Sequence, residues 1–376
     1  MNGPSPFQDA VVLAPLTVGG NLPFRRLCAQ MGADVTVGEM AVVRKLLSGT
    51  PSEFALLKSH PDERLFGVQL ADKNPETLAE GARLAQSRGA RFVDLNCGCP
   101  IDEITRRGLG ASLLRKPARL GRLVAAMKEA VSIPVTVKLR AGWSEAKVNV
   151  REVARLCEEN GAAAIALHGR TREQRYSKAA DWDLIGQVAA ERGVPVIGNG
   201  DILTGYEARE RRRHSGVRSV MLGCGALIKP WLFREVKTGE TWLPTADDRL
   251  GVLWRFVELL REHFGVDERG RKRTLRFLPW HLNFFCRYVP LPEEQYGEAA
   301  REHPLIQSRV QAPPPVSALE RLLGDGRTDT HQRFAGELLD SASLDEARER
   351  ATRLAEGLAP DEGDGELRLS RSEVAG

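Results

Sequence analysis

Short apolar runs rich in β-branched residues alternate with longer amphipathic stretches over most of the chain. The amphipathic stretches, such as 75–87 and 150–160, have the length and periodicity of helices. Strands that alternate with such helices predict parallel β/α units. Eight units match a (β/α)8 TIM barrel of the α/β class. The eight predicted strands lie at 11–14, 35–38, 65–70, 91–96, 134–139, 163–168, 195–198 and 217–222.

After residue 245 the pattern changes to helical periodicity without intervening strands. Leu250, Leu253 and Val257 mark one apolar face, and Thr245 followed by Asp248 is a typical N-terminal cap. Further helices are predicted at 274–288, 317–323, 328–339 and 344–358. We therefore predict a smaller all-helical C-terminal domain after the barrel.

The predicted domains are a barrel over residues 1–240 and a helical domain over 245–358. Residues 359–376 are acidic, contain glycine and have few large apolar groups. Such a composition cannot bury enough apolar surface to fold, so we predict a disordered tail there.

The composition indicates a globular protein that acts away from membranes. Hydrophobic residues make up 42% of the 376 residues, and no apolar run approaches the length of a membrane span. The N-terminus lacks a basic region followed by an apolar core, so we predict a cytoplasmic protein. The net charge of +4 is compatible with an anionic partner but does not identify one.

The six cysteines are scattered and predict reduced thiols rather than a disulfide framework. Cys97 and Cys99 have the spacing of half a metal site. No second Cys or His pair at zinc-finger spacing accompanies them, so we expect no metal.

Polar residues recur where the predicted strands end. In a barrel these ends point into one shared site, so their recurrence predicts a ligand pocket. The residues are Leu16 and Thr17 after the first run, Gln69 in the third, Asn96 and Cys99 after the fourth, Lys138 in the fifth, His168 and Arg170 after the sixth, Asn199, Gly200 and Asp201 after the seventh, and Gly223, Cys224 and Gly225 after the eighth.

The last two turns indicate what is bound. A Gly-rich turn that opens into a helix after the seventh and eighth strands offers backbone N–H groups to a phosphate. This arrangement resembles the site of a flavin mononucleotide. Lys138 and Gln69 would then lie beside the redox ring, where a cation stabilises the reduced, anionic form.

These residues belong to a longer series of motifs that resembles the tRNA-dihydrouridine synthases. The likeness is greatest to the branch whose eukaryotic members carry N-terminal zinc fingers, and it covers roughly residues 9–310. In order, the motifs are LAPL (13–16), NLPFRRLC (21–28), GADVT (32–36), GEMA (38–41), FGVQL (66–70), NCGCPID (96–102), HGRTREQRY (168–176), ADW (180–182), GNGDIL (198–203) and KPWLF (229–233).

The resemblance implies reduction of the C5–C6 double bond of a uridine in tRNA, with FMN as cofactor and NADPH or NADH as reductant. Hydride from reduced FMN would go to C6 of the uracil, and Cys99 would protonate C5. Asn96 and Arg170 would hold the uracil. The implied FMN contacts are Leu16, Thr17 and Val18 by their backbone, with Gln69, Lys138, His168, Asn199, Gly200, Asp201, Gly223 and Cys224.

A thiol suits this role because an ordinary cysteine, with a pKa of about 8.5, keeps its proton at neutral pH, whereas a carboxylic acid does not. The loop after Cys99 contains Arg106 and Arg107, which we interpret as a lid with basic groups for a phosphate of the substrate. By strand alternation Cys97 faces the opposite way, and we interpret it as packing.

A uridine in folded RNA must leave its stack to reach a pocket, so phosphate contacts should supply most of the affinity. Basic residues of the predicted helical domain are candidates for a tRNA surface, although a solvated helix face is an equally good interpretation. These residues are Arg269, Arg271, Lys272, Arg273, Arg276 and Arg287. We expect a monomer.

Two departures from the family pattern keep other interpretations open. The family usually has an arginine on the FMN phosphate where this chain has Cys224, and the zinc-finger extension is missing from this chain. We therefore expect tRNA contacts from the barrel and helical domain alone. The alternatives are dihydrouridine synthesis on another RNA such as rRNA, a flavin barrel reductase of a small molecule, and a non-catalytic RNA-binding relative.

Overall fold

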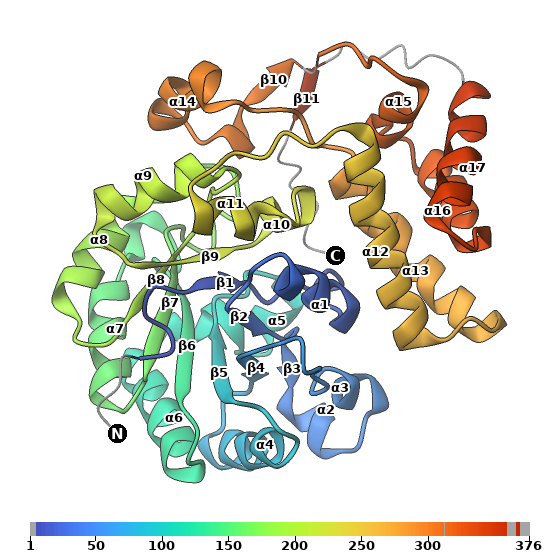
Figure 1. Ribbon diagram of the computed structural model, residues 1–376. Coiled ribbons are helices and arrows are strands. Elements are labelled where there is room, and N and C mark those ends of the chain that lie inside the picture. Colours follow the sequence, from blue (N-terminus) through green and yellow to red (C-terminus); the bar gives the residue numbers. More distant parts are fainter. Residues whose placement is uncertain (1–4, 312, 359–365, 369–376) are drawn as a thin grey trace.

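Eight parallel strands form a closed barrel in the computed structural model, which describes residues 5–311, 313–358 and 366–368 (Figure 1). The ring closes because β1 pairs with β9 while β2 pairs with both β1 and β4. All eight strands predicted from the sequence are confirmed. They are β1 Val11–Leu13, β2 Val35–Val37, β4 Phe66–Ala71, β5 Phe92–Cys97, β6 Val135–Arg140, β7 Ala164–His168, β8 Val196–Asn199 and β9 Ser219–Leu222, with the short β3 Ala41–Val42 added beside β4.

The barrel strands are buried on both faces, since side chains fill the interior and helices cover the outside. Side chains at the helix starts satisfy free backbone N–H groups, as where Asn74 accepts from Thr77 and where Thr204 and Glu207 form a capping box. The helices are α1 Leu22–Gln30, α2 Val43–Leu47, α3 Pro51–Ala55, α4 Pro75–Ser87, α5 Asp102–Arg106, α6 Pro117–Ala130, α7 Val150–Glu159, α8 Trp182–Glu191, α9 Gly205–Ser215, α10 Cys224–Ile228 and α11 Leu232–Thr238.

A group of helices follows the barrel, as the periodicity predicts. Thr245 and Asp248 form the expected capping box at the start of the first of them. The helices of this group are α12 Ala246–Phe264, α13 Glu268–Phe285, α15 Ala318–Gly324, α16 Thr328–Asp340 and α17 Leu344–Glu356.

The connection between α13 and α15 lies against the barrel (Figure 1). It contains α14 Glu293–Glu302 and the 3-10 turn Leu305–Gln307. The backbone N–H of Leu305 donates to the buried carboxylate of Glu207 on α9 at 2.9 Å. The C-terminal region therefore covers part of the barrel mouth.

The structure adds one short strand pair to the helices of this region: β10 Arg309–Gln311 pairs antiparallel with β11 Glu366–Arg368. Residues 366–368 of the predicted tail form β11, and the other residues of this tail, 359–365 and 369–376, lie outside the described residues.

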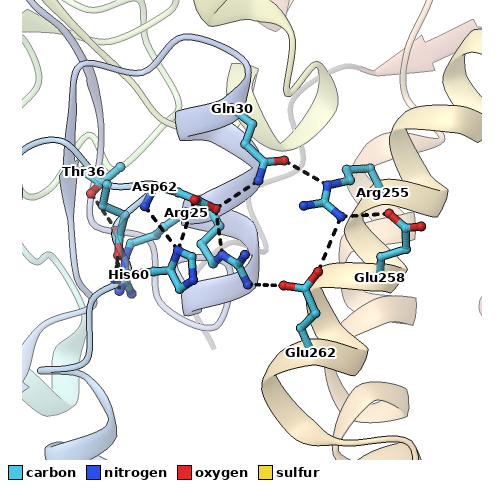
Figure 2. A network of polar contacts seen from close by, with 10 residues as sticks. Arg25, Gln30, Thr36, His60, Asp62, Arg255, Glu258 and Glu262 are labelled. Atoms are coloured by element: carbon cyan, nitrogen blue, oxygen red, sulfur yellow. Dashed lines mark hydrogen bonds and ion pairs between the residues drawn. The ribbon is translucent and has the colours of Figure 1, made fainter.

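A polar network joins the barrel to α12 (Figure 2). Arg26 on α1 donates to Asp62 at 2.9 Å and to Glu262 on α12 at 2.7 Å. Arg255 on α12 donates to Gln30 on α1 at 3.0 Å. The bonds from Arg26 to Glu262 and from Arg255 to Gln30 connect α1 of the barrel to α12 of the helical domain.

A fully buried ion pair lies within the barrel beside this network. Arg25 donates to Glu63 at 2.7 Å, and the same carboxylate accepts from Thr36 at 2.7 Å. Arg25 also donates to the carbonyl of Gly20 at 2.9 Å. A buried ion pair whose other hydrogen-bonding groups have partners holds this part of the fold in one arrangement.

Among the described residues, no helix is long and apolar enough to span a membrane.

Candidate active site

One cavity opens at the carboxyl ends of the barrel strands, and it collects nearly all the side chains predicted from the strand ends. Val18, which the resemblance implied as a backbone contact of FMN, does not line the cavity. Its backbone N–H donates to Glu39 at 2.8 Å, and its φ of 65° is strained for a β-branched residue. The predicted residues that line the cavity are Leu16, Thr17, Gln69, Asn96, Cys99, Lys138, His168, Arg170, Asn199, Gly200, Asp201, Gly223, Cys224 and Gly225.

A chain of amide and carboxylate groups fixes the floor of the cavity. Strand register places Gln69, Asp94 and Thr136 side by side on β4, β5 and β6. The Asp94 carboxylate accepts from Thr136 at 2.6 Å and from Gln69 Nε2 at 2.8 Å. Burial raises the pKa of Asp94, although both hydrogen bonds oppose the shift. Sequence reasoning missed Asp94, whose position inside a strand resembles an ordinary core position.

Asn96 links this floor to the loop that carries Cys99. Its Nδ2 donates to Gln69 Oε1 at 2.7 Å, and its Oδ1 accepts from the backbone N–H of Cys99 at 3.0 Å. The resemblance implied a uracil contact for Asn96. In the structure, its amide holds the Gln69 side chain and the Cys99 turn in place.

The Cys99 thiol is half-buried at the cavity wall. Burial raises its pKa, and the backbone at Ile101 and the Arg140 guanidinium reduce the shift. The thiol therefore carries its proton at neutral pH. A neighbouring positive charge stabilises the thiolate that remains after the proton has left.

Arg140 holds the loop that carries Cys99 by hydrogen bonds to backbone carbonyls. It donates to the carbonyl of Gly98 at 2.9 Å and to the carbonyl of Thr171 at 3.0 Å, which ties the loop after β5 to the loop after β7. The chain then reverses at Gly110, where φ is 61° and a Cβ would lie 2.8 Å from the carbonyl oxygen of Cys99. A side chain at Gly110 would push the Cys99 loop away.

Lys138 places an ammonium group inside the cavity. Its Nζ donates to Asn199 Oδ1 at 2.8 Å, and Asn199 in turn donates to the carbonyl of Met221 at 2.8 Å. Removal from water lowers the pKa of Lys138 to about 7, and the charge of Arg140 acts in the same direction. An anionic group bound beside Lys138 would restore its positive charge.

His168, Arg170 and Asp201 form a cluster beside Lys138, at the carboxyl ends of β7 and β8. Arg170 donates to both carboxylate oxygens of Asp201 at 2.7 Å and to His168 Nε2 at 3.1 Å. A guanidinium can only donate, so Nε2 accepts and the proton of the neutral imidazole lies on Nδ1. Burial lowers the pKa of His168 well below its ordinary value, aided by the charges of Arg140, Lys138 and Arg170.

Arg170 has little freedom to bind a substrate directly. Its side chain is 2% exposed, and its Nε donates to the carbonyl of Lys178 in addition to the bonds above. The resemblance implied that Arg170 holds the uracil. The structure shows it holding Asp201, whose φ of 52° is sustained by these contacts and by a bond from the backbone N–H of Ala180.

Sequence reasoning missed residues that reach the cavity from other segments. Tyr176 lies under the guanidinium groups of Arg140 and Arg170, with 5.6 and 5.9 Å to its ring centre. Tyr176 could have been predicted from the sequence, because it is an aromatic residue in the loop that follows a strand end. Phe284 and Gln307 come from the C-terminal region, and only the tertiary fold brings them to the cavity.

The predicted lid arginines do not line the cavity. Arg106 is exposed at the end of α5, and Arg107 is exposed just after it and pairs with Glu103 at 2.7 Å. Cys97, by contrast, is fully buried, which confirms the prediction that it packs in the interior.

Most of the predicted RNA-binding residues lie on the outer part of α13. Arg269, Arg273 and Arg276 are exposed there, and Lys272 pairs with Glu268 at 2.6 Å. Arg271 is partly exposed and pairs with Asp340. These side chains provide a basic surface outside the cavity.

Arg287 does not share this surface, which corrects the grouping made from the sequence. It is 6% exposed and lines the cavity. The reason is the direction of α13, whose first residues are exposed and whose last turn packs on the barrel, against α10.

Comparisons with known proteins identify the family. A family model described as dihydrouridine synthase (Dus) matches residues 12–290. A protein of Coprinopsis cinerea named tRNA-dihydrouridine(47) synthase [NAD(P)(+)] is 43% identical over 332 residues, or 84% of this chain and 48% of that protein. A Homo sapiens protein named tRNA-dihydrouridine(47) synthase [NAD(P)(+)]-like is 45% identical over 289 residues, or 76% and 44%.

The chain spans about half the length of these curated relatives. The family match nevertheless includes every barrel strand from β2 to β9 and nearly all of β1, and it extends through α13. The chain therefore belongs to the dihydrouridine synthase family.

Proposed function

We propose that this protein reduces the C5–C6 double bond of a uridine in tRNA to 5,6-dihydrouridine, with FMN as cofactor and NADPH or NADH as reductant. The observation that carries the proposal is the protonated Cys99 thiol in a cavity that also holds Lys138 and Gln69. Family membership and the names of the two relatives support it.

The cavity has the donor set that FMN requires. Four cationic side chains of the described residues line it, Lys138, Arg140, Arg170 and Arg287, against one carboxylate, Asp201. This excess of positive charge favours an anionic ligand. The residues fit FMN in chemistry: amide and ammonium groups for the carbonyl edge of its ring, and a guanidinium for its phosphate.

We assign the ring to the side of the cavity with Gln69, Lys138 and His168. The neutral His168 presents an N–H at Nδ1, and Lys138 presents further N–H donors. When bound, FMN supplies the hydride that adds to C6 of the uracil, and NAD(P)H reduces it again.

Cys99 completes the reaction by giving its proton to C5. Hydride at C6 leaves an enolate, and the thiol proton converts this enolate to the saturated ring. The thiolate left on Cys99 lies near the Arg140 guanidinium. Because Cys99 is only half-buried, it recovers its proton from solvent after the product leaves.

The uridine reaches this thiol only after leaving the base stack of the RNA. We propose that the exposed arginines of α13, namely Arg269, Arg273 and Arg276, bind phosphates of the surrounding tRNA. The names of the relatives specify position 47, so we propose that position as the first target to examine.

The test is to incubate the purified protein with FMN, NADPH and tRNA transcribed without modifications, and to map dihydrouridine by mass spectrometry. Dihydrouridine at a single position, absent when NADPH is omitted, is expected. Ribosomal RNA fragments and free uracil serve as competing substrates. Reduction of free uracil or of rRNA in preference to tRNA would contradict the proposed substrate, and no product from any of them would contradict the enzymatic function.

A further inference from the structure

The turn after β9 offers no charge to a phosphate. Parallel barrels bind phosphate groups at the loops after the seventh and eighth strands, which here follow β8 and β9. The side chain at the β9 turn is Cys224, and burial raises the pKa of its thiol, so it remains neutral. A neutral thiol supplies neither the charge nor the paired hydrogen bonds with which arginine binds phosphate.

The cationic side chains from the barrel strands and their loops have other partners. Lys138 donates to Asn199, Arg140 donates to the carbonyls of the loops after β5 and β7, and Arg170 holds Asp201 with two bonds. Releasing any of them would leave a buried polar partner unsatisfied. These three side chains therefore hold the strand ends and loops of the barrel in place.

Arg287 is in the right place. It lies two residues beyond the end of α13 and lines the cavity together with Gly223 and Cys224. Arg287 is close to the β9 turn because α13, which ends two residues before Arg287, packs on α10, which begins at Cys224. The charge of Arg287 lowers the pKa of the Cys224 thiol, against the effect of burial. Arg287 thus brings to the β9 turn the charge that Cys224 lacks.

The surroundings of Arg287 suit it to bind an anion. Its guanidinium lies 4.5 Å from the ring centre of Phe284, which supports the planar group by one face. The side chain is 6% exposed, so its interaction with an anion is weakly screened by water. The glycine at position 223 leaves room at the β9 turn, because a Cβ there would meet nothing closer than Ala14 Cβ, at 3.8 Å.

We propose that Arg287 binds the phosphate group of FMN, in the place where the β9 turn carries Cys224. The inference rests on the proposed use of FMN. It also gives the helical domain a second role, because a residue of this domain then completes a cofactor site built mainly by the barrel. FMN binding would thereby favour the docked arrangement of the two domains.

The test measures the dissociation constants of FMN and of riboflavin, which lacks the phosphate, by quenching of flavin fluorescence on the flavin-free protein. Arg287→Gln should weaken FMN binding by about 10- to 100-fold, the effect of losing a charged hydrogen-bond pair. Riboflavin binding should change less than about twofold, since only the phosphate contact is removed. Arg333→Gln, at an exposed position on α16, is the matched control and should leave both constants unchanged.

A second variant separates a phosphate contact from a structural role. Cys224→Arg in the Arg287→Gln background should recover most of the FMN affinity without affecting riboflavin. If Arg287→Gln fails to fold, the two single variants Arg287→Lys and Cys224→Arg still test the phosphate contact. Arg287→Lys should reduce the preference for FMN over riboflavin, and Cys224→Arg should increase it.

Equal weakening of FMN and riboflavin by Arg287→Gln, or an unchanged FMN constant, would overturn the inference. The proposed function fails separately. Loss of the FMN preference in the variant, together with a wild-type protein that reduces no uridine, would support the phosphate contact while contradicting the synthase activity.

Discussion

The burial of His281, at the junction of the two domains, predicts that the unfolding free energy falls as the pH is lowered. It lies on α13, is 3% exposed, and packs between Phe24 and Phe256 with ring centres 4.6 and 4.7 Å away. Asn21 Nδ2 donates to its Nε2 at 3.1 Å, so the proton of the neutral ring is on Nδ1. Nδ1 has no hydrogen-bond partner among the described residues.

A second proton on this ring would place an unpaired charge in an apolar interface. Burial therefore lowers the pKa of His281 to about 3 from its ordinary value of 6.5. A group with a lowered folded pKa stabilises the protein fully above its unfolded pKa, and this stability is lost as the pH falls from 6.5 towards 3. Between pH 7 and pH 5 the loss from His281 is about 2 kcal/mol.

The assay compares urea unfolding at pH 7 and pH 5 for the wild type and His281→Gln, followed by tryptophan fluorescence. Glutamine keeps an acceptor for Asn21 but does not titrate. The wild type should lose about 2 kcal/mol more than the variant between the two pH values, whatever the stability of the variant at pH 7. Equal pH dependence in wild type and His281→Gln would refute this reasoning.

Three further predictions concern the barrel. Gly225→Ala places a Cβ 2.2 Å from the carbonyl oxygen of Ile202, so the melting temperature and the flavin content should both fall. The control Gly251→Ala meets nothing within 4 Å and should raise the unfolding free energy by up to about 1 kcal/mol. Equal melting temperatures of the two variants would contradict this. Cys97→Ser buries a hydroxyl in an apolar site and should lower the unfolding free energy by about 1–3 kcal/mol in denaturant titrations without abolishing dihydrouridine formation. Competitive labelling of amines, read by mass spectrometry on the flavin-free protein, should give Lys138 a pKa of about 7, and a value near that of exposed lysines would count against the proposed cavity environment.

The barrel could be predicted from the sequence because its signals are local. Each strand is a short apolar run, and the caps at Thr204 and Thr245 involve residues three positions apart. The polar residues at the strand ends could also be grouped, because a parallel barrel brings all carboxyl ends to one face. This rule alone predicts that Cys99 and Lys138 line one cavity.

The remaining parts of the site depend on contacts distant in sequence. Arg287 and Gln307 reach the cavity only because α13 and the segment after it pack on the barrel, and no periodicity reports that docking. The resemblance implied that Asn96 and Arg170 hold the uracil, whereas their hydrogen bonds in the structure hold Gln69 and Asp201. The β10–β11 pair joins segments more than 50 residues apart, which composition alone cannot reveal.

The most direct test of the proposed function is single-turnover reduction of unmodified tRNA by Cys99→Ala protein whose flavin has first been reduced with NADPH. The variant should bind FMN and accept electrons from NADPH as the wild type does, yet form dihydrouridine at least about 100-fold more slowly, because its general acid is missing. Cys97→Ala should form dihydrouridine at the wild-type rate, since Cys97 lies in the interior. Dihydrouridine formation by Cys99→Ala at the wild-type rate would contradict the assignment of Cys99 as the proton donor.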